Sequence, residues 1–196
     1  MKNSYDRIAK KWDAYMKTKK VPQIIRRFAG SLPKGANILD IGCGSGMPIA
    51  SFLADAGFSI CGIDSSEEML RLAQMNCPEH AEFHKSDLLA FSCDQKFDAA
   101  IAFDSLFHIE NEEQEAAFQK VASLLKKGGL FLFTHGKNEG SVTGEMFGEN
   151  FCYFTPGSKK ILKMLKSHGF SVLETLFDYR EAEMGSRELI VIARKE

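Results

Sequence analysis

ILDIGCGSGMP, residues 38–48, is an apolar run that ends in an acidic residue and opens at once into three alternating glycines. The apolar run predicts a buried strand. Pro48 suits the first turn of a helix, where its missing N–H would have no intrahelical partner. The glycines at 42, 44 and 46 allow a positive φ and let a ligand approach the backbone closely. The stretch therefore predicts a strand, loop and helix unit that binds a nucleotide-like ligand.

The charge and spacing of this loop narrow the class of ligand. The dinucleotide fingerprint has its third glycine where Met47 stands, and a P-loop would end in Lys followed by Ser or Thr, which this loop does not have. Asp40 at the mouth of the loop would repel a pyrophosphate. A ligand that brings a positive charge close to Asp40 fits better.

The loop resembles that of the class I S-adenosylmethionine-dependent methyltransferases. The resemblance extends over most of residues 36–135 and is weaker toward the C-terminus. The ligand of this family has no phosphate and carries an ammonium and a sulfonium, for which Asp40 has the favourable charge. The resemblance implies S-adenosylmethionine as the cofactor, in contact with a loop formed by Gly42, Gly44 and Gly46.

Two further polar strand ends follow in the order that the resemblance implies. The apolar run 59–64 ends in Asp64, which follows Asp40 by 24 positions, and Asp87 follows Asp64 by 23. A carboxylate at the end of the second strand can accept hydrogen bonds from both ribose hydroxyls, and we expect Asp64 to do so. The resemblance implies that Asp87 faces the adenine amino group and that the backbone N–H of Leu88 meets a ring nitrogen.

The remaining expected cofactor contacts lie next to these strand ends or in the N-terminal segment. Ser65 and Glu68 form the pattern of a capping box at the start of a helix that contains Met69. We place Ser65 and Met69 in the cofactor site, together with Phe103 at the end of the apolar run 97–103 and Tyr15 in the N-terminal segment.

Apolar strands alternate with amphipathic helical stretches along the chain. Strands are expected near 36–41, 59–64, 81–85, 97–103 and 129–135, and helices near 47–57, 66–76 and 111–126. This alternation predicts an α/β fold with a Rossmann-like, doubly wound, mostly parallel sheet and helices on both faces. The resemblance implies seven strands, closed by an antiparallel hairpin near 170–177 and 187–194.

The chain is expected to form a single methyltransferase domain over residues 1–196. Its N-terminal helical segment, 1–30, carries an aromatic stripe that includes Tyr5, Trp12 and Tyr15 and is expected to be a lid over the cofactor. The cofactor-binding core is 36–135. Residues 136–154 are rich in glycine, lack a clear period and are expected to form a substrate-side loop. A C-terminal helix from about 155 to 168 and the strand hairpin complete the chain.

The loop after the run 97–103 is where the family brings the methyl donor and acceptor together. Asp104 and His108 are the candidate catalytic residues, and they share one face if this turn is helical. His108 has an ordinary pKa of about 6.5 and could orient or deprotonate the acceptor. In the alternative interpretation His108 packs under the edge of the sheet and Asp104 caps a helix. His135 and Tyr153 are weaker candidates.

Composition and missing motifs exclude several partners. The net charge of −1 gives no basic footprint for nucleic acid, and no stretch approaches the roughly 20 apolar residues of a membrane helix. The Asn-Pro-Pro-Tyr-like signature of enzymes that methylate amines and amides of nucleic acids and proteins is absent, which favours a small-molecule acceptor. Five cysteines without CxxC spacing indicate reduced thiols and a cytoplasmic protein.

The sequence also bears on a metal-assisted reaction and on two alternative functions. Asp104 and Asn138 could imitate part of a Mg²⁺ site, but no second acidic ligand is evident, so we expect no metal. An NAD(P)-dependent oxidoreductase would share the sheet and Asp64, yet it needs the glycine that Met47 replaces. A non-catalytic S-adenosylmethionine-binding module would keep the cofactor motifs and lose only the acceptor chemistry. Residues 104–108 and 136–153 are compatible with methylation of O, N, S or C.

Overall fold

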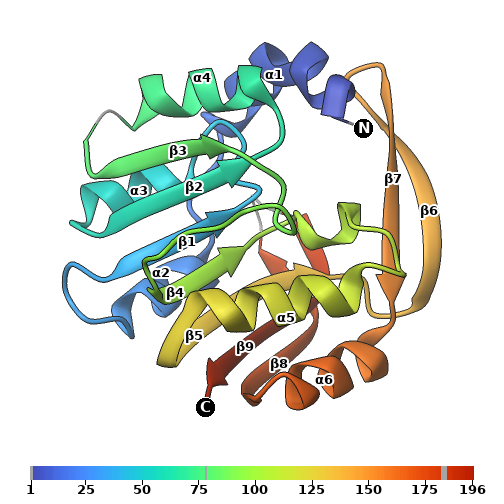
Figure 1. Cartoon of the computed structure of the whole chain (residues 1–196). Helices are drawn as coiled ribbons and strands as arrows, with labels where there is room; N and C mark the ends of the chain where they lie inside the picture. Colours follow the sequence, from blue (N-terminus) through green and yellow to red (C-terminus); the bar gives the residue numbers. More distant parts are fainter. Residues whose placement is uncertain (1, 78, 182–184) are drawn as a thin grey trace.

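A seven-stranded sheet forms the centre of the computed structural model, which describes residues 2–77, 79–181 and 185–196. Its order is β3-β2-β1-β4-β5-β9-β8, with the first five neighbours parallel and β9 antiparallel to both β5 and β8 (Figure 1). The strands are β1 (Asn37–Ile41), β2 (Ser59–Asp64), β3 (Ala81–Lys85), β4 (Phe97–Ala102), β5 (Leu125–His135), β8 (Phe170–Glu181) and β9 (Gly185–Lys195). The expected Rossmann-like fold is confirmed.

Helices cover both faces of this sheet, as the alternating pattern predicts. They are α1 (Lys2–Met16), α2 (Gln23–Gly30), α3 (Ile49–Asp55), α4 (Glu67–Asn76), α5 (Gln114–Leu124) and α6 (Ser158–Ser167), with a 3₁₀ turn η1 (Leu106–His108) after β4. Within the described ranges, none of them combines the length and the apolar character of a membrane span.

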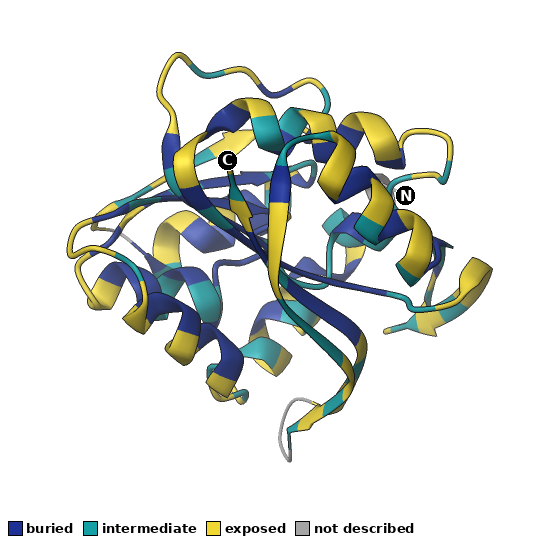
Figure 2. Ribbon diagram, turned by 90° about the horizontal axis from the view of Figure 1, so that it is seen from below, coloured by how far each residue is buried: buried dark blue, intermediate teal, exposed yellow. Residues whose placement is uncertain are grey.

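Two apolar cores lie on opposite faces of the sheet because successive strand residues point to opposite sides. In β1, Ile38 packs with α2 and α3, whereas Leu39 packs with α5 and α6. In β5, Leu132 joins the first of these cores and Phe131 the second. Figure 2 shows the buried residues concentrated along the sheet and on the inner sides of the helices. The strands are therefore apolar on both faces, as in buried parallel sheets.

The ends of several helices differ from the sequence-based expectation. The N-terminal part of the chain contains two helices, α1 and α2, with Pro22 at the N-cap of α2. The cap of α4 is Ser66, whose hydroxyl accepts from the backbone N–H of Met69, and the expected capping box at Ser65 is wrong by one position. Pro48 precedes α3 instead of lying in its first turn. The helix expected from 155 starts only at α6, because 149–156 is extended.

The expected irregular loop at 136–154 is wrong, because this segment forms an antiparallel hairpin of β6 (Glu139–Met146) and β7 (Glu149–Pro156). Phe147 and Gly148, the two residues between these strands, both have positive φ, as tight hairpin turns require. Gly144 lies opposite the ring of Tyr153, so this glycine leaves space for an aromatic side chain. In Figure 1 the hairpin stands beside the main sheet and runs from the level of α1 to α6.

Tight packing at Gly62 generates a prediction about stability. A Cβ at this position in β2 would lie 2.5 Å from the ring of Phe83 and 2.9 Å from the sulfur of Cys43. Gly62→Ala should therefore lower the free energy of unfolding by about 1–3 kcal/mol through overpacking. Gly30→Ala is the matched control, because nothing lies within 4 Å of its Cβ. Denaturant unfolding measures both variants, and equal stability of the two would contradict the prediction.

Candidate functional site

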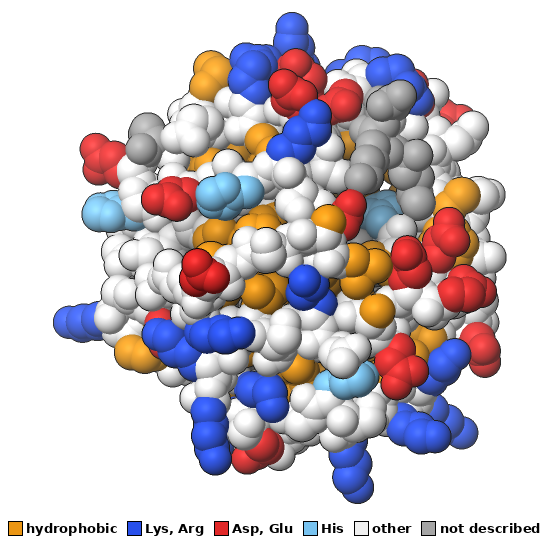
Figure 3. Space-filling view, viewed as in Figure 1, with side chains coloured by type: hydrophobic (Ala, Val, Ile, Leu, Met, Phe, Trp, Pro, Cys, Tyr) orange, Lys and Arg blue, Asp and Glu red, His pale blue; other side chains and the backbone are white. Residues whose placement is uncertain are grey.

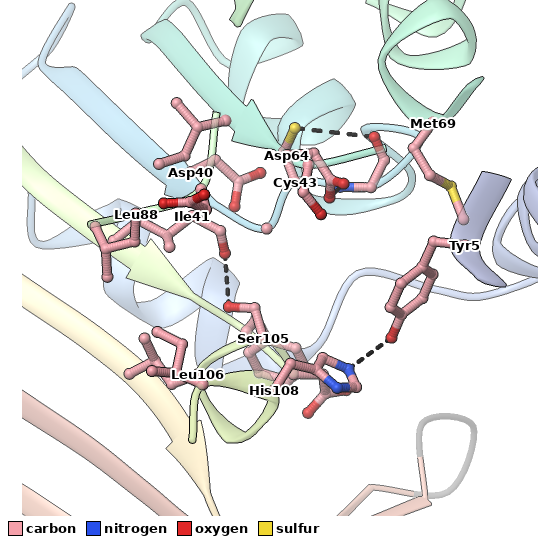
Figure 4. A pocket seen from close by; sticks show the side chains of 18 of the residues that line it. Tyr5, Asp40, Ile41, Cys43, Asp64, Met69, Leu88, Ser105, Leu106 and His108 are labelled. Carbon is pink, nitrogen blue, oxygen red and sulfur yellow. Dashed lines mark hydrogen bonds between the residues drawn. The ribbon is translucent and has the colours of Figure 1, made fainter. Parts of the chain in front are cut away.

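A cavity of about 640 Å³ opens at the carboxyl ends of the parallel strands. Residues at the ends of β1, β2 and β4 and in the loop after β3 line it, and the inner face of α1 covers it (Figure 4). This is where ligands bind in open α/β sheets. On the face drawn in Figure 3, apolar side chains gather toward the middle and most charged side chains lie toward the rim.

The glycine loop is shaped by contacts with two neighbouring strand ends. The backbone N–H of Gly44 donates to one carboxylate oxygen of Asp64, and the N–H of Ser66 donates to the other, both at 2.9 Å. A Cβ at Gly42, where φ is +72°, would lie 2.4 Å from the Cβ of Ser105, so only glycine allows this close approach. Ser105 in turn donates its hydroxyl to the carbonyl of Ile41 at 2.6 Å.

Asp40 is a buried carboxylate in the wall of the cavity, with 4% of its surface exposed. Burial and the nearby Asp64 carboxylate raise its pKa to about 7. Within the described ranges no group donates a hydrogen bond to it. A buried carboxylate without a partner is unfavourable unless a ligand supplies a donor or a positive charge. Asp40 therefore fits the cationic cofactor that the sequence predicts.

The face of α1 that points into the cavity does not include every residue of the aromatic stripe. Tyr5, Trp12 and Met16 line the cavity, since positions 5, 12 and 16 share one side of a helix. Tyr15 lies about a quarter of a turn away. It is 45% exposed and packs against the ring of Phe147 at 6.0 Å, outside the cavity lining. Tyr5 thus takes the place at the cavity that was expected for Tyr15.

Polar contacts fix α1 at both of its ends. Near its start, the Asp6 carboxylate accepts from the hydroxyl of Ser66 at 2.6 Å, and Arg7 forms an ion pair with Glu149 of β7. Near its end, the amide of Asn76 donates to Asp13 at 2.7 Å. These contacts join α1 to α4 and to the hairpin.

His108 lies in the cavity wall with both ring nitrogens engaged. Nδ1 is 3.2 Å from the backbone carbonyl of Cys152. Because a carbonyl can only accept, Nδ1 carries the proton and Nε2 keeps its lone pair. The hydroxyl of Tyr5 then donates to Nε2 at 2.6 Å (Figure 4). Burial lowers the pKa of His108, so the imidazole is neutral and presents an acceptor nitrogen.

Asp104 also lines the cavity, but its carboxylate is already paired with the side chain of Arg187. Arg187 of β9 donates from Nε and from a terminal nitrogen to the two carboxylate oxygens, at 2.6 and 2.5 Å. The hydroxyl of Thr134 donates to the same carboxylate at 3.0 Å. Ser105, and not Asp104, is the N-cap of η1. A carboxylate in a bidentate pair with arginine is a poor proton acceptor, so its contacts favour a positioning role over the expected catalytic one.

A second histidine supports the turn η1 from behind. The N–H of Gly136 donates to Nδ1 of His135, so Nε2 donates to the side-chain oxygen of Gln114 at 3.2 Å. The amide of Gln114 donates to the carbonyls of Leu106 and Ile109. His135 is almost fully buried, which lowers its pKa to about 4. It lies outside the cavity lining and orders the turn that carries His108.

The other expected site residues divide between the cavity and its surroundings. Ser65, Met69, Asp87, Leu88 and Phe103 line the cavity. Gly46 does not, and its Cβ position faces the sulfur of Cys77. Across the described part of the chain, no three His, Cys, Asp or Glu side chains are grouped so that they could hold a metal ion.

Sequence reasoning missed Ser105, Gln114 and Arg187. Ser105 was visible only as part of the Asp104-Ser105 pair, and its tie to Ile41 spans 64 positions. Gln114 connects two loops from within an otherwise ordinary amphipathic helix. Arg187 pairs with a residue 83 positions away, and no local pattern distinguishes it from other surface arginines.

Known proteins resemble this chain in both sequence and structure. Residues 38–129 match a family model described as a methyltransferase domain. A putative methyltransferase of Geobacillus sp. (strain WCH70) is 35% identical over 127 residues, which are 62% of this chain and 48% of that protein. The chain spans about half the length of the curated relatives it matches.

Two solved structures extend the likeness to the fold. A SAM-dependent methyltransferase from Methanosarcina mazei is 25% identical with a TM-score of 0.75, covering 90% of this chain and 98% of that one. The magnesium protoporphyrin IX methyltransferase of Synechocystis PCC 6803, solved with bound SAM, is 25% identical with a TM-score of 0.68, covering 89% and 79%.

The burial of His135 generates a prediction about pH. Its pKa is about 4 in the folded chain, against about 6.5 when unfolded. Protons therefore bind the unfolded state more readily, and stability is lost as the pH falls from 6.5 toward 4. Between pH 7 and pH 5 this should lower the free energy of unfolding by about 2 kcal/mol.

His135→Gln removes the titrating ring and should shrink this difference between pH 7 and pH 5 by about 2 kcal/mol. His84→Gln, at an exposed position of β3, is the control and should keep the wild-type difference. The raised pKa of Asp40 changes the free energy of unfolding in the opposite direction between these pH values, but Asp40 is present in all three proteins and does not affect their comparison. Urea unfolding at the two pH values measures the effect, and an unchanged difference in His135→Gln would be inconsistent with a neutral buried imidazole.

Proposed function

We propose that the chain is a class I S-adenosylmethionine-dependent methyltransferase and transfers a methyl group from S-adenosylmethionine to a small-molecule acceptor bound in the cavity. The observation that carries this proposal is Asp40, a buried carboxylate at the cavity wall without a donor in the described ranges. The ammonium of the cofactor would supply the missing positive charge.

Three strand ends would hold the cofactor. Asp64 has two oxygens at the cavity, each already accepting one backbone N–H, and their remaining lone pairs can accept from the ribose hydroxyls. Asp87 and the backbone of Leu88 would face the adenine, at the end of the cavity formed by the loop after β3. When bound, the cofactor supplies a methyl group on a positively charged sulfur, so the protein mainly has to position the acceptor.

The acceptor would lie on the side of the cavity formed by η1. We assign His108 as the group that orients the acceptor and takes its proton, because it lines the cavity and its Nε2 has a lone pair, which now accepts from the Tyr5 hydroxyl. Asp104, paired with Arg187, would position the strand ends without touching the proton. One cavity of about 640 Å³ would hold both the cofactor and the acceptor, which favours a small molecule.

Helix α1 would act as a lid over the cavity, anchored to the hairpin of β6 and β7. The ion pair between Arg7 and Glu149 joins the two directly, and Tyr5 and Trp12 form the roof. Closure of such segments excludes water from the reacting centre. The five cysteines are free thiols, which supports a reducing, cytoplasmic location.

Two alternative functions make different predictions. An NAD(P)-dependent oxidoreductase would have to place a pyrophosphate beside the buried carboxylate of Asp40, which electrostatics disfavours. A non-catalytic S-adenosylmethionine-binding module would bind the cofactor equally well and show no methyl transfer. Cofactor binding and turnover therefore separate the three.

The cofactor site is tested by Asp64→Ala. The variant should bind S-adenosylhomocysteine roughly tenfold to a hundredfold more weakly, because the ribose loses its acceptor and Gly44 its anchor. Asp55→Ala, at the exposed end of α3, is the charge-matched control and should bind like the wild type. Calorimetry measures both, and NAD should give no signal. Wild-type affinity in Asp64→Ala would refute the ribose assignment.

The catalytic assignment is tested by His108→Ala. Methyl transfer should fall roughly a hundredfold or more, as for loss of a general base, while affinity for S-adenosylhomocysteine stays nearly unchanged. A metabolite pool screened by mass spectrometry for an added methyl group supplies the acceptor, and His84→Ala is the control. A parallel loss of turnover and cofactor affinity, or a loss of stability alone, would assign His108 to packing.

A further inference from the structure

We propose that the phenol of Tyr5 occupies the acceptor's place in the cavity, and that the acceptor is an uncharged aromatic molecule whose ring hydroxyl displaces Tyr5 from Nε2 of His108. This inference rests on the proposed function, because it names the class of molecule that the same cavity would methylate. Tyr5 would then be a specificity-determining residue that stands in for the substrate when none is bound.

The first argument is the shape of the space that Tyr5 fills. Its ring packs at 4.7 Å from the ring of Phe151 and meets the His108 ring edge-on at 5.4 Å. The rings of Phe107 and Tyr153 lie 4.9 and 5.2 Å from the same imidazole. The imidazole of His108 is therefore surrounded by aromatic rings, and the side chain that reaches its Nε2 is itself a six-membered ring.

The second argument is the hydrogen bond that the occupant must make. The carbonyl of Cys152 fixes the proton on Nδ1, so Nε2 can only accept. A buried acceptor nitrogen without a donor is unfavourable, and the Tyr5 hydroxyl now satisfies it at 2.6 Å. Any molecule that replaces Tyr5 must bring a donor of its own to the same point, as a ring hydroxyl does.

The third argument is the charge of the lining. Six carboxylates line the cavity, and in the described part of the chain neither lysine nor arginine is among the lining residues, which disfavours an anionic acceptor. Burial, with Tyr153, Asp64 and Asp104 nearby, raises the pKa of Tyr5 above its ordinary value. The hydroxyl at this point is therefore held in its protonated, hydrogen-bond-donating form. The carboxylates are those of Asp40, Asp64, Asp87, Asp104, Glu110 and Glu113.

The reaction that follows is balanced by groups already present. The hydroxyl oxygen of the acceptor forms a bond to the methyl carbon, and the electron pair of the broken carbon–sulfur bond stays on sulfur, which becomes a neutral thioether. The hydroxyl proton passes to Nε2 of His108. The product is an aryl methyl ether, which cannot donate to Nε2. Once Nε2 has released its proton to water, the Tyr5 hydroxyl can donate to it again.

Free p-cresol, which is the tyrosine side chain as a separate molecule, is the probe. The protein is first saturated with S-adenosylhomocysteine, and the signal of Nε2 of His108 is followed by NMR in protein labelled with ¹⁵N-histidine. p-Cresol should shift this signal and bind at least about tenfold more tightly than toluene, the factor that one hydrogen bond supplies. 4-Hydroxybenzoate, which adds a negative charge, should bind at least about tenfold more weakly than p-cresol.

Tyr5→Phe keeps the ring and removes the competing hydroxyl, so its affinity for p-cresol should rise by up to about tenfold. Tyr179→Phe is the matched control, because it loses a hydrogen bond to Glu181 on β8, away from the cavity lining, and should bind like the wild type. The wild-type comparison of p-cresol with toluene stands even if the Tyr5 variant does not fold.

Equal binding of p-cresol and toluene, or weaker binding of p-cresol to Tyr5→Phe, would overturn the inference. Failure of the protein to bind S-adenosylhomocysteine in the first step would instead overturn the proposed function. If the protein binds S-adenosylhomocysteine but binds the three probes equally, the proposed function stands and only the assignment of the acceptor as an uncharged aromatic molecule is refuted.

Discussion

The carboxylate of Asp64 determines the shape of the cofactor loop. It ends β2 and accepts backbone N–H groups from the glycine loop on one side and from the start of α4 on the other. The glycines give the chain freedom to turn, and Asp64 selects one of the conformations that this freedom allows. Its charge has a second effect, because it helps to raise the pKa of the buried Asp40 carboxylate. A ligand that brings positive charge would stabilise both acidic groups.

The parts of the fold that sequence predicted are those governed by local chemistry. Apolar strands, the glycine loop and the polar residues at the ends of β1, β2 and β3 are visible in short windows. The hairpin of β6 and β7 was missed because its glycines and polar residues look like a loop. Gly144, however, makes room for Tyr153, and the turn at Phe147 and Gly148 sets the register.

The contacts that build the acceptor side could not be predicted in the same way. Tyr5 meets His108 across 103 positions, and Cys152 reaches the same imidazole across 44. Pairs so distant in the chain depend on how α1 and the hairpin pack against the sheet. The choice of Tyr15 over Tyr5 has a simpler cause, since an aromatic stripe spans more than one direction and the sequence does not say which edge faces inward.

The contact between His108 and residue 152 uses only the main chain of the hairpin. The proton on the imidazole is therefore set by where the strand runs, and not by which side chain stands at that position. The side chain at position 152 could therefore be replaced without disturbing the protonation of the ring. A shift of one residue in the register of β7 would change both, since it would move the carbonyl away from Nδ1 and turn the side chains of the strand to the opposite face.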